Sequence, residues 1–328
     1  MLEQHVFTIP MRTRFRGLDV REGVLLRGPA GWAEFSPFWD YDPAQSLPWW
    51  RAAVESATTP WPAPRRDHVP VNATVPAVPP ERVLEVLARF PGCTTVKVKV
   101  AEGGRSDPDT VAGDLARLAA VREAVGPGGR VRVDLNGAWS LPDALVLLPR
   151  YDRAAAGLEY AEQPCGSVED LAALRRKVEV PIAADESIRR GNDPMAVRRL
   201  QAADIAVLKV APLGGVRAAL GLAERLDLPV VVSSAIESSI GIAAGLALAA
   251  ALPELRYACG LGTVGLLGAD VVTDPLTAVD GHLLVRRPEP DPVALAELAA
   301  AEPVRARWVE RMAAVRRLAG DEPPGAPA

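Results

Sequence analysis

Charged side chains stand near the ends of five consecutive apolar runs in this 328-residue sequence. In chain order the runs supply two lysines, three acids and a further lysine, with successive charges 35, 28, 23 and 24 residues apart. That spacing is typical of a strand followed by a helix, so the charges would arrive at the same edge of a parallel sheet. The residues are Lys97, Lys99, Asp134, Glu162, Asp185 and Lys209.

Three acids on neighbouring strands can act together as a metal site. Parallel strands lie about 4.8 Å apart, so Asp134, Glu162 and Asp185 can converge on a single cation. Without a cation, the three carboxylates would repel one another and raise their pKa values. Because the ligands are all oxygen, with no His or Cys in the pattern, we expect a hard ion. Mg²⁺ fits best, with Mn²⁺ able to substitute.

The lysines suit proton transfer beside such an ion. Lys97 and Lys99 are two residues apart, so they share one face of their strand, while Lys209 approaches from across the sheet. A nearby cation and a second lysine disfavour the ammonium form and lower the pKa of a lysine toward neutrality. A neutral lysine can remove a proton α to a carboxylate, and the bound ion then holds the enediolate charge. The pattern therefore predicts an enzyme that acts on a small-molecule carboxylate.

Each of these charges, taken alone, is more typical of a solvated strand end or of a helix cap. Asp204, which precedes one of the apolar runs, fits such a cap. Five runs with charges in register favour the functional interpretation instead. The three histidines, His5, His68 and His282, are scattered and have no partner in the pattern, so we assign them no catalytic role.

The apolar runs alternate with helical stretches from residue 71 to residue 271. Most runs are continuously apolar, which is typical of strands covered on both faces. Eight strands with seven intervening helices predict an α/β fold, a parallel TIM-like barrel. The expected strands are 71–75, 94–100, 130–134, 157–162, 180–185, 204–209, 229–234 and about 255–259, and the expected helices are 80–89, 109–125, 141–149, 167–177, 193–201, 214–227 and 238–251.

The two ends of the chain follow a different pattern. Residues 1–70 contain three short strand-like runs punctuated by glycine, which predict an antiparallel meander, and then a helix near 48–57. Residues 272–328 contain a short strand, a helix and a tail rich in Pro and Ala. We expect this segment to fold back on the meander, with the last few residues disordered.

Composition excludes several classes of protein. Hydrophobic residues make up 49% and charged residues 24%, with a net charge of −4, so nothing favours a nucleic-acid or membrane partner. The apolar stretch at 229–252 contains Glu237 and four serines, which would be costly in lipid. The N-terminus does not fit a secretory signal, and three dispersed cysteines suit a reducing compartment. We expect a cytoplasmic protein, and nothing in the sequence selects an oligomeric state.

The order Lys-x-Lys, Asp, Glu, Asp, Lys resembles the enolase superfamily, in particular its muconate-lactonizing branch with lysines on both sides of the site. Local sequences are most similar to the o-succinylbenzoate synthase family. Four stretches carry the likeness: VRVDLNGAW at 131–139, EQPC at 162–165, ADESIR at 184–189 and SSAIESS at 233–239.

The resemblance implies a (β/α)₇β barrel under a capping domain formed by 1–70 and 272–328. It implies that Asp134, Glu162 and Asp185 bind Mg²⁺ and that Lys99 is the base. The implied reaction is a syn dehydration of 2-succinyl-6-hydroxy-2,4-cyclohexadiene-1-carboxylate to o-succinylbenzoate, a step of menaquinone biosynthesis. Lys209 would stabilise the anion as a cation. Substrate contacts are expected from Lys97, Asn136, Ser233, Ser234, Glu237 and Ser238.

Two alternatives remain open at this point. Racemisation of an N-acylamino acid, such as an N-succinylamino acid, would use Lys99 and Lys209 as bases on opposite faces. A non-catalytic barrel that serves as a scaffold or binding protein would need neither lysine. The connection from Arg12 to Arg21 is also shorter than the lid of many superfamily members, which leaves open how well the site excludes water.

Overall fold

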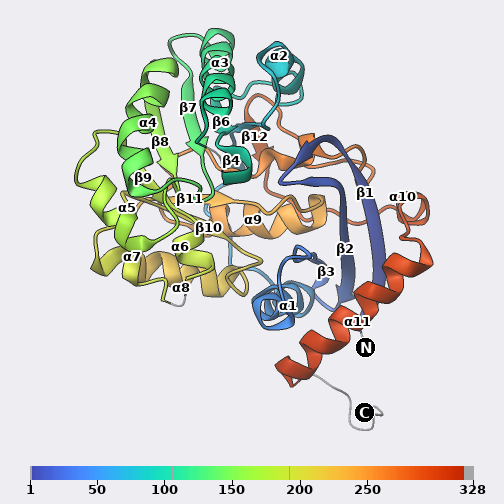
Figure 1. Ribbon diagram of the computed structural model, residues 1–328. Helices are drawn as coiled ribbons and strands as arrows, with labels where there is room; N and C mark the ends of the chain where they lie inside the picture. The colour runs from blue at the N-terminus through green and yellow to red at the C-terminus, as the bar shows by residue number, and fades with distance from the viewer. Residues whose placement is uncertain (1, 105, 192, 321–328) are drawn as a thin grey trace.

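The computed structural model describes residues 2–104, 106–191 and 193–320. A parallel barrel and a three-stranded antiparallel sheet lie next to each other, and the chain crosses from the sheet to the barrel and back (Figure 1). The fold class expected from the sequence is confirmed by this architecture. The predicted disordered tail, at 321–328, lies outside the described residues.

The barrel wall is, among the described residues, a seven-stranded parallel sheet in which each strand pairs with the next one along the chain. Its strands are almost wholly buried because helices cover the outside and side chains fill the inside. The strands are β5 (Ala73–Val75), β6 (Thr95–Lys99), β7 (Arg130–Asp134), β8 (Leu158–Glu162), β9 (Ile182–Ala184), β10 (Ile205–Lys209) and β11 (Val230–Ser233).

The predicted eighth strand at 255–259 is wrong in extent. Among the described residues, Cys259 and Gly260 alone close the barrel: Cys259 donates its N–H to the Pro70 carbonyl at 2.7 Å, and Gly260 donates to the Val232 carbonyl at 2.8 Å. Each makes an isolated parallel bridge, Cys259 to Val71 and Gly260 to Ser233. Pairing stops there because the chain turns directly into a 3₁₀ helix at Gly262–Leu266.

The helices begin where side chains cap their free N–H groups. Ser140, for example, accepts from Asp143 N at the start of α4. The predicted helix at 193–201 is reduced to the four residues of α7. The barrel helices are α2 (Val83–Leu87), α3 (Pro108–Val125), α4 (Leu141–Ala154), α5 (Val168–Arg175), α6 (Glu186–Arg189), α7 (Ala196–Arg199), α8 (Val216–Leu226) and α9 (Ser239–Ala251).

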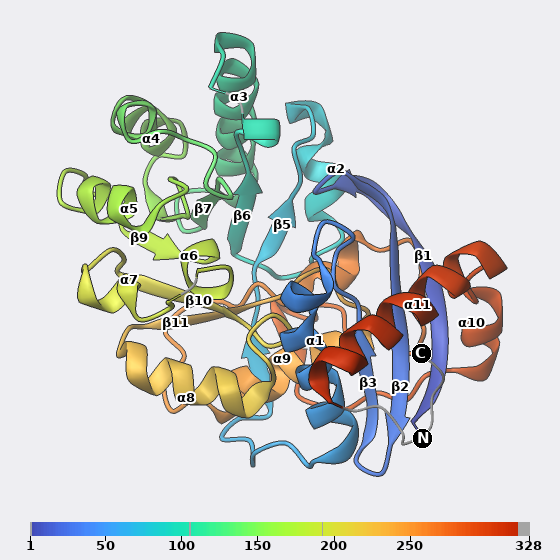
Figure 2. The ribbon, with the colours of Figure 1, turned by 60° about the horizontal axis from the view of Figure 1, so that its bottom comes forward.

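The antiparallel sheet comprises β1 (Glu3–Phe15), β2 (Leu18–Gly28) and β3 (Gly31–Phe35), and we call it the cap sheet. Helix α1 (Pro43–Thr58) packs against β3 and against the C-terminal helix α11 (Glu302–Ala319). Figure 2 shows α11 crossing in front of the cap sheet, with α10 (Pro292–Glu297) beside its start. The two ends of the chain therefore come together beside the barrel.

Backbone hydrogen bonds join the C-terminal segment to the first strand. Thr8 donates its N–H to the Leu298 carbonyl at 2.8 Å, and Ala300 donates to the Val6 carbonyl at 2.9 Å. A second contact pairs β4 (His68–Pro70) with β12 (His282–Leu284) in antiparallel register. No helix in the described part of the chain is long and apolar enough to cross a membrane.

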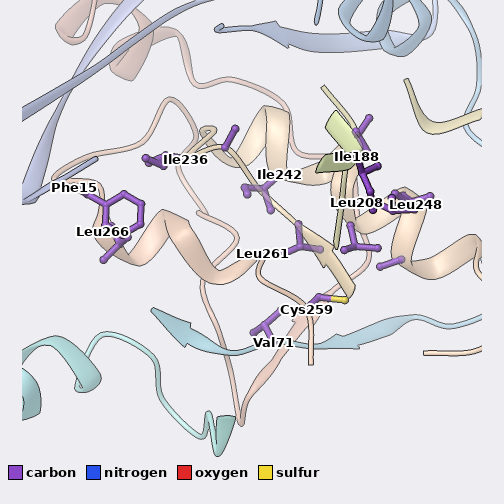
Figure 3. Close-up of a cluster of buried hydrophobic side chains, with 14 of the residues drawn as sticks. Phe15, Val71, Ile188, Leu208, Ile236, Ile242, Leu248, Cys259, Leu261 and Leu266 are labelled. Carbon is purple, nitrogen blue, oxygen red and sulfur yellow. The ribbon is translucent and has the colours of Figure 1, made fainter. Parts of the chain in front are cut away.

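One apolar core runs from the barrel into the cap sheet. Figure 3 shows Phe15 from the end of β1 near Leu266 and Ile236, with Leu208, Leu248 and Cys259 further along the same cluster. Because buried side chains pack at nearly crystalline density, a core of this kind holds the cap sheet in one position relative to the barrel. That position matters for the site described next.

Candidate active site

The six charged residues singled out from the sequence lie at the carboxyl ends of successive barrel strands, and we call them the rim cluster. Strand register brings Lys99 opposite Asp134 and Asp134 opposite Glu162. Asp185 follows the last residue of β9, and Lys209 ends β10 opposite Ser233. Active sites of barrel enzymes lie at this end of the barrel. The spacing in the sequence therefore predicted where these side chains meet.

Each acid of the rim cluster is bonded to at least one amine. The Lys97 ammonium lies 3.0 Å from both Glu162 carboxylate oxygens and 3.1 Å from Asp134 Oδ2. Lys99 Nζ lies 2.5 Å from Asp134 Oδ2, and Lys209 Nζ lies 2.6 Å from Asp185 Oδ2. The three carboxylates are buried, so these charge-assisted hydrogen bonds lie in a medium of low polarity.

Within the described residues, no group of three or more His, Cys, Asp or Glu side chains is arranged to hold a metal ion. Lysine ammonium groups are instead bonded to the three rim carboxylates. The donor chemistry nevertheless fits a hard divalent ion, because every candidate ligand is a buried carboxylate oxygen. Asp134 and Glu162 already share one positive charge, the Lys97 ammonium.

The rim environment shifts the acids in different directions. Burial alone would raise the pKa of Asp134, but Lys99, Lys97 and Lys209 outweigh it and hold that pKa well below the usual range. Asp185 behaves alike, with Arg189 and Lys209 lowering its pKa against the effect of burial. For Glu162, burial and the neighbouring Asp134 raise the pKa despite Lys97. Two of the three acids are thus firmly ionised.

The two lysines on β6 also differ. Burial lowers the pKa of Lys99, helped by the charge on Lys97 and opposed by Asp134. For Lys97 the same burial is outweighed by Glu162 and Asp134, which raise its pKa above the normal value. Lys99 is therefore the better base of the pair, and Lys97 is a permanent cation.

A cavity opens over the rim cluster between the barrel and the cap sheet. Lys97, Lys99 and Lys209 line it together with predicted contacts Asn136, Ser233 and Ser234. Asn136 also accepts a hydrogen bond from Lys99 Nζ at 2.7 Å, which orients the amine. Phe15, Arg16, Phe38 and Trp49 line it from the cap side, and Ile236 lines it from the loop after β11. Asp134 and Arg189 are among the further barrel residues in its wall.

Two predicted contacts lie elsewhere. Glu237 does not line this cavity but a neighbouring one, and its carboxylate accepts a hydrogen bond from Ala235 N at 2.6 Å. Ser238 is fully buried and donates its hydroxyl to Glu34 of the cap sheet at 2.5 Å. Ser238 is thus placed to support the loop, whereas Glu237 lines a neighbouring cavity that Ser233 and Ser234 also line. The apolar, serine-rich run gave no sign of this difference.

Arg189 is a cavity residue that the sequence reasoning did not select. Its Nε lies 2.8 Å from Asp185 Oδ1, and its Nη1 lies 2.6 Å from the Tyr41 hydroxyl. The signal was available, because a residue four positions after an acid faces it on a helix. Arg189 therefore fixes one oxygen of Asp185 while Lys209 fixes the other.

The short connection between the first two strands is a two-residue hairpin turn. Phe15 pairs with Leu18, and both intervening residues have positive φ, 54° at Arg16 and 74° at Gly17. Such turns match the twist of antiparallel strands. The Arg16 guanidinium stacks 4.0 Å from the centre of the Phe38 ring and lines the cavity. The hairpin tip thus lies beside the cavity.

Asp204, interpreted from the sequence as a helix cap, has a different role. Its carboxylate accepts a hydrogen bond from Ile182 N at 2.9 Å and another from Arg175 Nε at 2.8 Å. It therefore ties two neighbouring barrel strands together near their amino ends, at the opposite end from the rim cluster. Local sequence could not distinguish this from capping, because the partner N–H lies 22 residues away.

Two protein-family models match the chain. The model described as enolase C-terminal domain-like matches residues 82–290, which is more than half of the chain. The model described as enolase N-terminal domain-like matches residues 6–57. Together they cover most of the barrel and the cap sheet with α1.

Curated relatives extend over nearly the whole chain. A protein of Thermobifida fusca (strain YX) named o-succinylbenzoate synthase is 59% identical over 310 residues, covering 94% of this chain and 95% of the relative. A protein of Mycolicibacterium smegmatis with the same name is 57% identical over 314 residues, covering 96% and 95%.

Solved structures share the fold at low sequence identity. A muconate lactonizing enzyme from Pseudomonas fluorescens, complexed with muconolactone, has a TM-score of 0.77 at 21% identity, covering 92% of this chain and 98% of that one. The L-Ala-D/L-Glu epimerase from Bacillus subtilis, in a substrate-liganded complex, has a TM-score of 0.73 at 22% identity, covering 88% and 96%. With the barrel, the cap sheet and these relatives in agreement, the chain belongs to the o-succinylbenzoate synthase family of the enolase superfamily.

Proposed function

We propose that this protein is an o-succinylbenzoate synthase, a hydro-lyase that dehydrates 2-succinyl-6-hydroxy-2,4-cyclohexadiene-1-carboxylate in menaquinone biosynthesis. Curated relatives of that name, 55–59% identical over almost the whole chain, support the reaction. The observation that carries the chemistry is the placement of Lys99, a lysine with a lowered pKa at the edge of the cavity. Its partner Asp134 keeps it in register with the other rim residues.

Asp134, Glu162 and Asp185 are the residues that would hold Mg²⁺, or Mn²⁺ in its place. Their buried oxygens are the donors that such ions prefer. When bound, the ion supplies positive charge that stabilises the negative charge developing on the substrate carboxylate. Lys97 positions two of these ligands, because its ammonium is bonded to both Asp134 and Glu162.

The neutral Lys99 amine takes the proton from the carbon next to the substrate carboxylate, and the resulting enediolate carries the electron pair. The Lys99 ammonium then gives that proton to the departing hydroxyl on the same face. The C–O bond breaks, water leaves, and the electron pair completes the aromatic ring of o-succinylbenzoate. Asn136 supports both steps by holding Lys99 Nζ at 2.7 Å.

Lys209 acts on the opposite flank as a cation. It stabilises the enediolate by its charge and transfers no proton in this reaction, while its bond to Asp185 fixes its direction. Ser233 and Ser234 line the same cavity and are proposed to contact the succinyl side of the substrate. We also propose that residues 71–271 form the catalytic barrel domain and that residues 1–70 and 272–328 form the capping domain. A cytoplasmic location, to which three free cysteines are suited, belongs to the same proposal.

Product formation by the purified protein tests this function. The substrate is incubated with protein that has been dialysed against EDTA, and o-succinylbenzoate is measured by absorbance and mass. We expect no product until Mg²⁺ is added back. Full activity in the presence of the chelator, or no product with added Mg²⁺, would refute the proposal.

Racemisation of an N-succinylamino acid is a second candidate, favoured by one observation. Lys99 and Lys209 line the same cavity, so an amine is available on each side of a bound substrate. A racemase would exchange the α-proton of such an amino acid with solvent. Incubation in D₂O followed by NMR decides this, and the absence of α-deuteration would remove racemisation as an activity.

A further inference from the structure

The loop between β11 and α9, residues 234–238, forms part of the cavity wall and contains a strained residue. Ile236 lines the cavity and has φ of +63°. A β-branched side chain in this left-handed region is unfavourable, and such residues persist only where surrounding contacts enforce them. The structure must therefore supply contacts that keep Ile236 in place.

Those contacts come from the cap sheet. Arg21 of β2 donates from Nε to the Ile236 carbonyl at 2.9 Å. Glu34 of β3 accepts from Ser238 N at 3.0 Å and from Ser238 Oγ at 2.5 Å. The cap sheet is thus hydrogen-bonded to the loop on both sides of Glu237.

Ser36 joins the two charged residues into one network. Its hydroxyl accepts from Arg21 Nη2 at 2.8 Å and donates to Glu34 Oε1 at 2.5 Å. Arg21, Glu34 and Ser36 are 2%, 8% and 1% exposed, so water does not compete for these bonds. We call Arg21, Glu34, Ser36, Glu237 and Ser238 the junction cluster.

The charges in the junction cluster are not balanced. Arg21 interacts with the charges of Glu34 and Glu237. Glu22 adds a further negative charge near it, and Arg16 adds a positive one. Burial raises the pKa of Glu34 to about 7, against the opposing effect of Arg21 and with the support of Glu237. Burial raises the pKa of Glu237 as well. An ionised Glu34 is therefore a cost to folding, and a cost of that kind is often kept at functional sites.

We propose that Arg21 and Glu34 are positioning residues that hold Ile236 and the β11–α9 loop in the shape that binds substrate. The proposal rests on the proposed function for the identity of the substrate. In the described part of the chain, neither residue makes a hydrogen bond or ion pair with the rim cluster, and neither lines the cavity that contains the lysines. Their effect on the reaction is therefore expected in substrate binding and not in the proton-transfer step.

A nearby acid provides a matched control. Asp270 accepts hydrogen bonds from Ser239 N at 3.2 Å and from Ser239 Oγ at 2.5 Å, one residue after the bonds made by Glu34. Its carboxylate contacts the first residue of α9, whose N-cap is Ser238, and burial raises the pKa of Asp270 too. It differs from Glu34 in that it does not link the cap sheet to the loop. Asp270→Asn therefore removes a similar charge without loosening the wall.

The test compares Glu34→Gln, Arg21→Gln and Asp270→Asn with the unaltered protein at pH 8. For the first two variants we expect KM for the dehydration substrate to rise about tenfold while kcat changes less than about threefold, which indicates a loss of binding. The double variant should be no worse than about the poorer single variant, because both act through one network. Asp270→Asn should leave KM unchanged.

The pH profile separates positioning from general stability. The Gln side chain resembles protonated Glu, so Glu34→Gln should show a raised KM that does not depend on pH. KM of the unaltered protein should rise toward that value as pH falls below about 7, because ionised Glu34 is the stronger acceptor for Ser238. Hydrogen exchange adds a readout without substrate: the Ser238 amide should exchange faster in Glu34→Gln.

Three results would overturn the proposal. They are an unchanged KM in a folded Glu34→Gln protein, an equal rise of KM in Asp270→Asn, and an unchanged exchange rate at Ser238. If Arg21→Gln does not fold, Glu34→Gln alone decides. A protein that forms no o-succinylbenzoate refutes the proposed function instead, and hydrogen exchange then still tests the grip of the cap sheet on the loop.

Discussion

The rim cluster and the junction cluster both bury carboxylates, but the pKa values of Asp134 and Asp185 at the rim shift in the opposite direction to those at the junction. At the rim, Asp134 and Asp185 are held ionised because lysines and Arg189 surround them. At the junction, Glu34 and Glu237 share the single guanidinium of Arg21, and their pKa values rise. Burial is common to both, so the balance of nearby cations and anions decides the direction. Glu162 at the rim lies beside two other acids, and its pKa is raised as well.

The comparison links charge balance to role. The three rim lysines and Asp134 line a cavity, which suits chemistry on a carboxylate. The junction lies outside that cavity and uses its acid to fasten a loop to the cap sheet. Removing a rim group should therefore abolish the reaction or the metal site, whereas removing a junction group should weaken substrate binding.

The largest effect is expected for Lys99→Ala. Loss of the general base should lower kcat about 10³-fold or more, with folding retained, because the side chain is partly exposed. Steady-state formation of o-succinylbenzoate measures the change, and circular dichroism checks the fold. Residual activity near that of the unaltered protein would mean that Lys99 is not the base.

The second largest effect is expected for Asp185→Asn, which should lower the free energy of unfolding of the metal-free protein. The substitution leaves Lys209 buried without its carboxylate and leaves Arg189 with Glu186 alone, and breaking a buried pair on one side costs about 3–5 kcal/mol. Urea unfolding in EDTA measures the free energy of unfolding. A change below about 1 kcal/mol would show that the rim pairs contribute little in this protein.

Glu34→Gln should stabilise the protein at high pH, whereas Asp185→Asn should destabilise it. The pKa of Glu34 is raised from 4.5 to about 7 in the folded chain, so its stabilising contribution is complete below about pH 4.5 and is lost as pH rises through 7. Relative to the unaltered protein, Glu34→Gln should gain up to about 3 kcal/mol between pH 5 and pH 8. Unfolding curves at both pH values test this, and a constant difference contradicts it.

The smallest effect is expected for Asp204→Asn, at the other end of the barrel. The variant weakens one hydrogen bond to Ile182 N and a half-exposed pair with Arg175, so about 1 kcal/mol of stability should be lost. Activity should not change, because Asp204 is remote from the rim. A clear loss of kcat in a folded Asp204→Asn protein would mean that the two barrel ends are coupled.

Much of the barrel could be predicted because its signals are local and periodic. Buried parallel strands appear as apolar runs, and the charge at the end of each run falls at the same edge of the sheet. Register then made Lys99, Asp134 and Glu162 neighbours, as the spacing predicted. The antiparallel cap sheet could be predicted from a different local signal, short strand-like runs separated by glycine.

The remainder depends on contacts between distant segments. Nothing near Ser238 indicates that its hydroxyl meets Glu34, which lies 204 residues earlier in the chain. The same holds for Arg21 and Ile236, 215 residues apart. A serine-rich turn after a barrel strand looks like a substrate loop whether its side chains face the cavity or the cap. Only the packing of the cap sheet distinguishes these two orientations.

The proposed function depends on the three rim acids sharing one divalent ion. Calorimetric titration of the metal-free protein with Mg²⁺ tests that claim most directly, with Asp185→Asn titrated in parallel. We expect one binding site per chain in the unaltered protein and no measurable binding in the variant. Absence of Mg²⁺ binding, or binding that is unaffected by Asp185→Asn, would contradict the assignment of the rim cluster as the metal site.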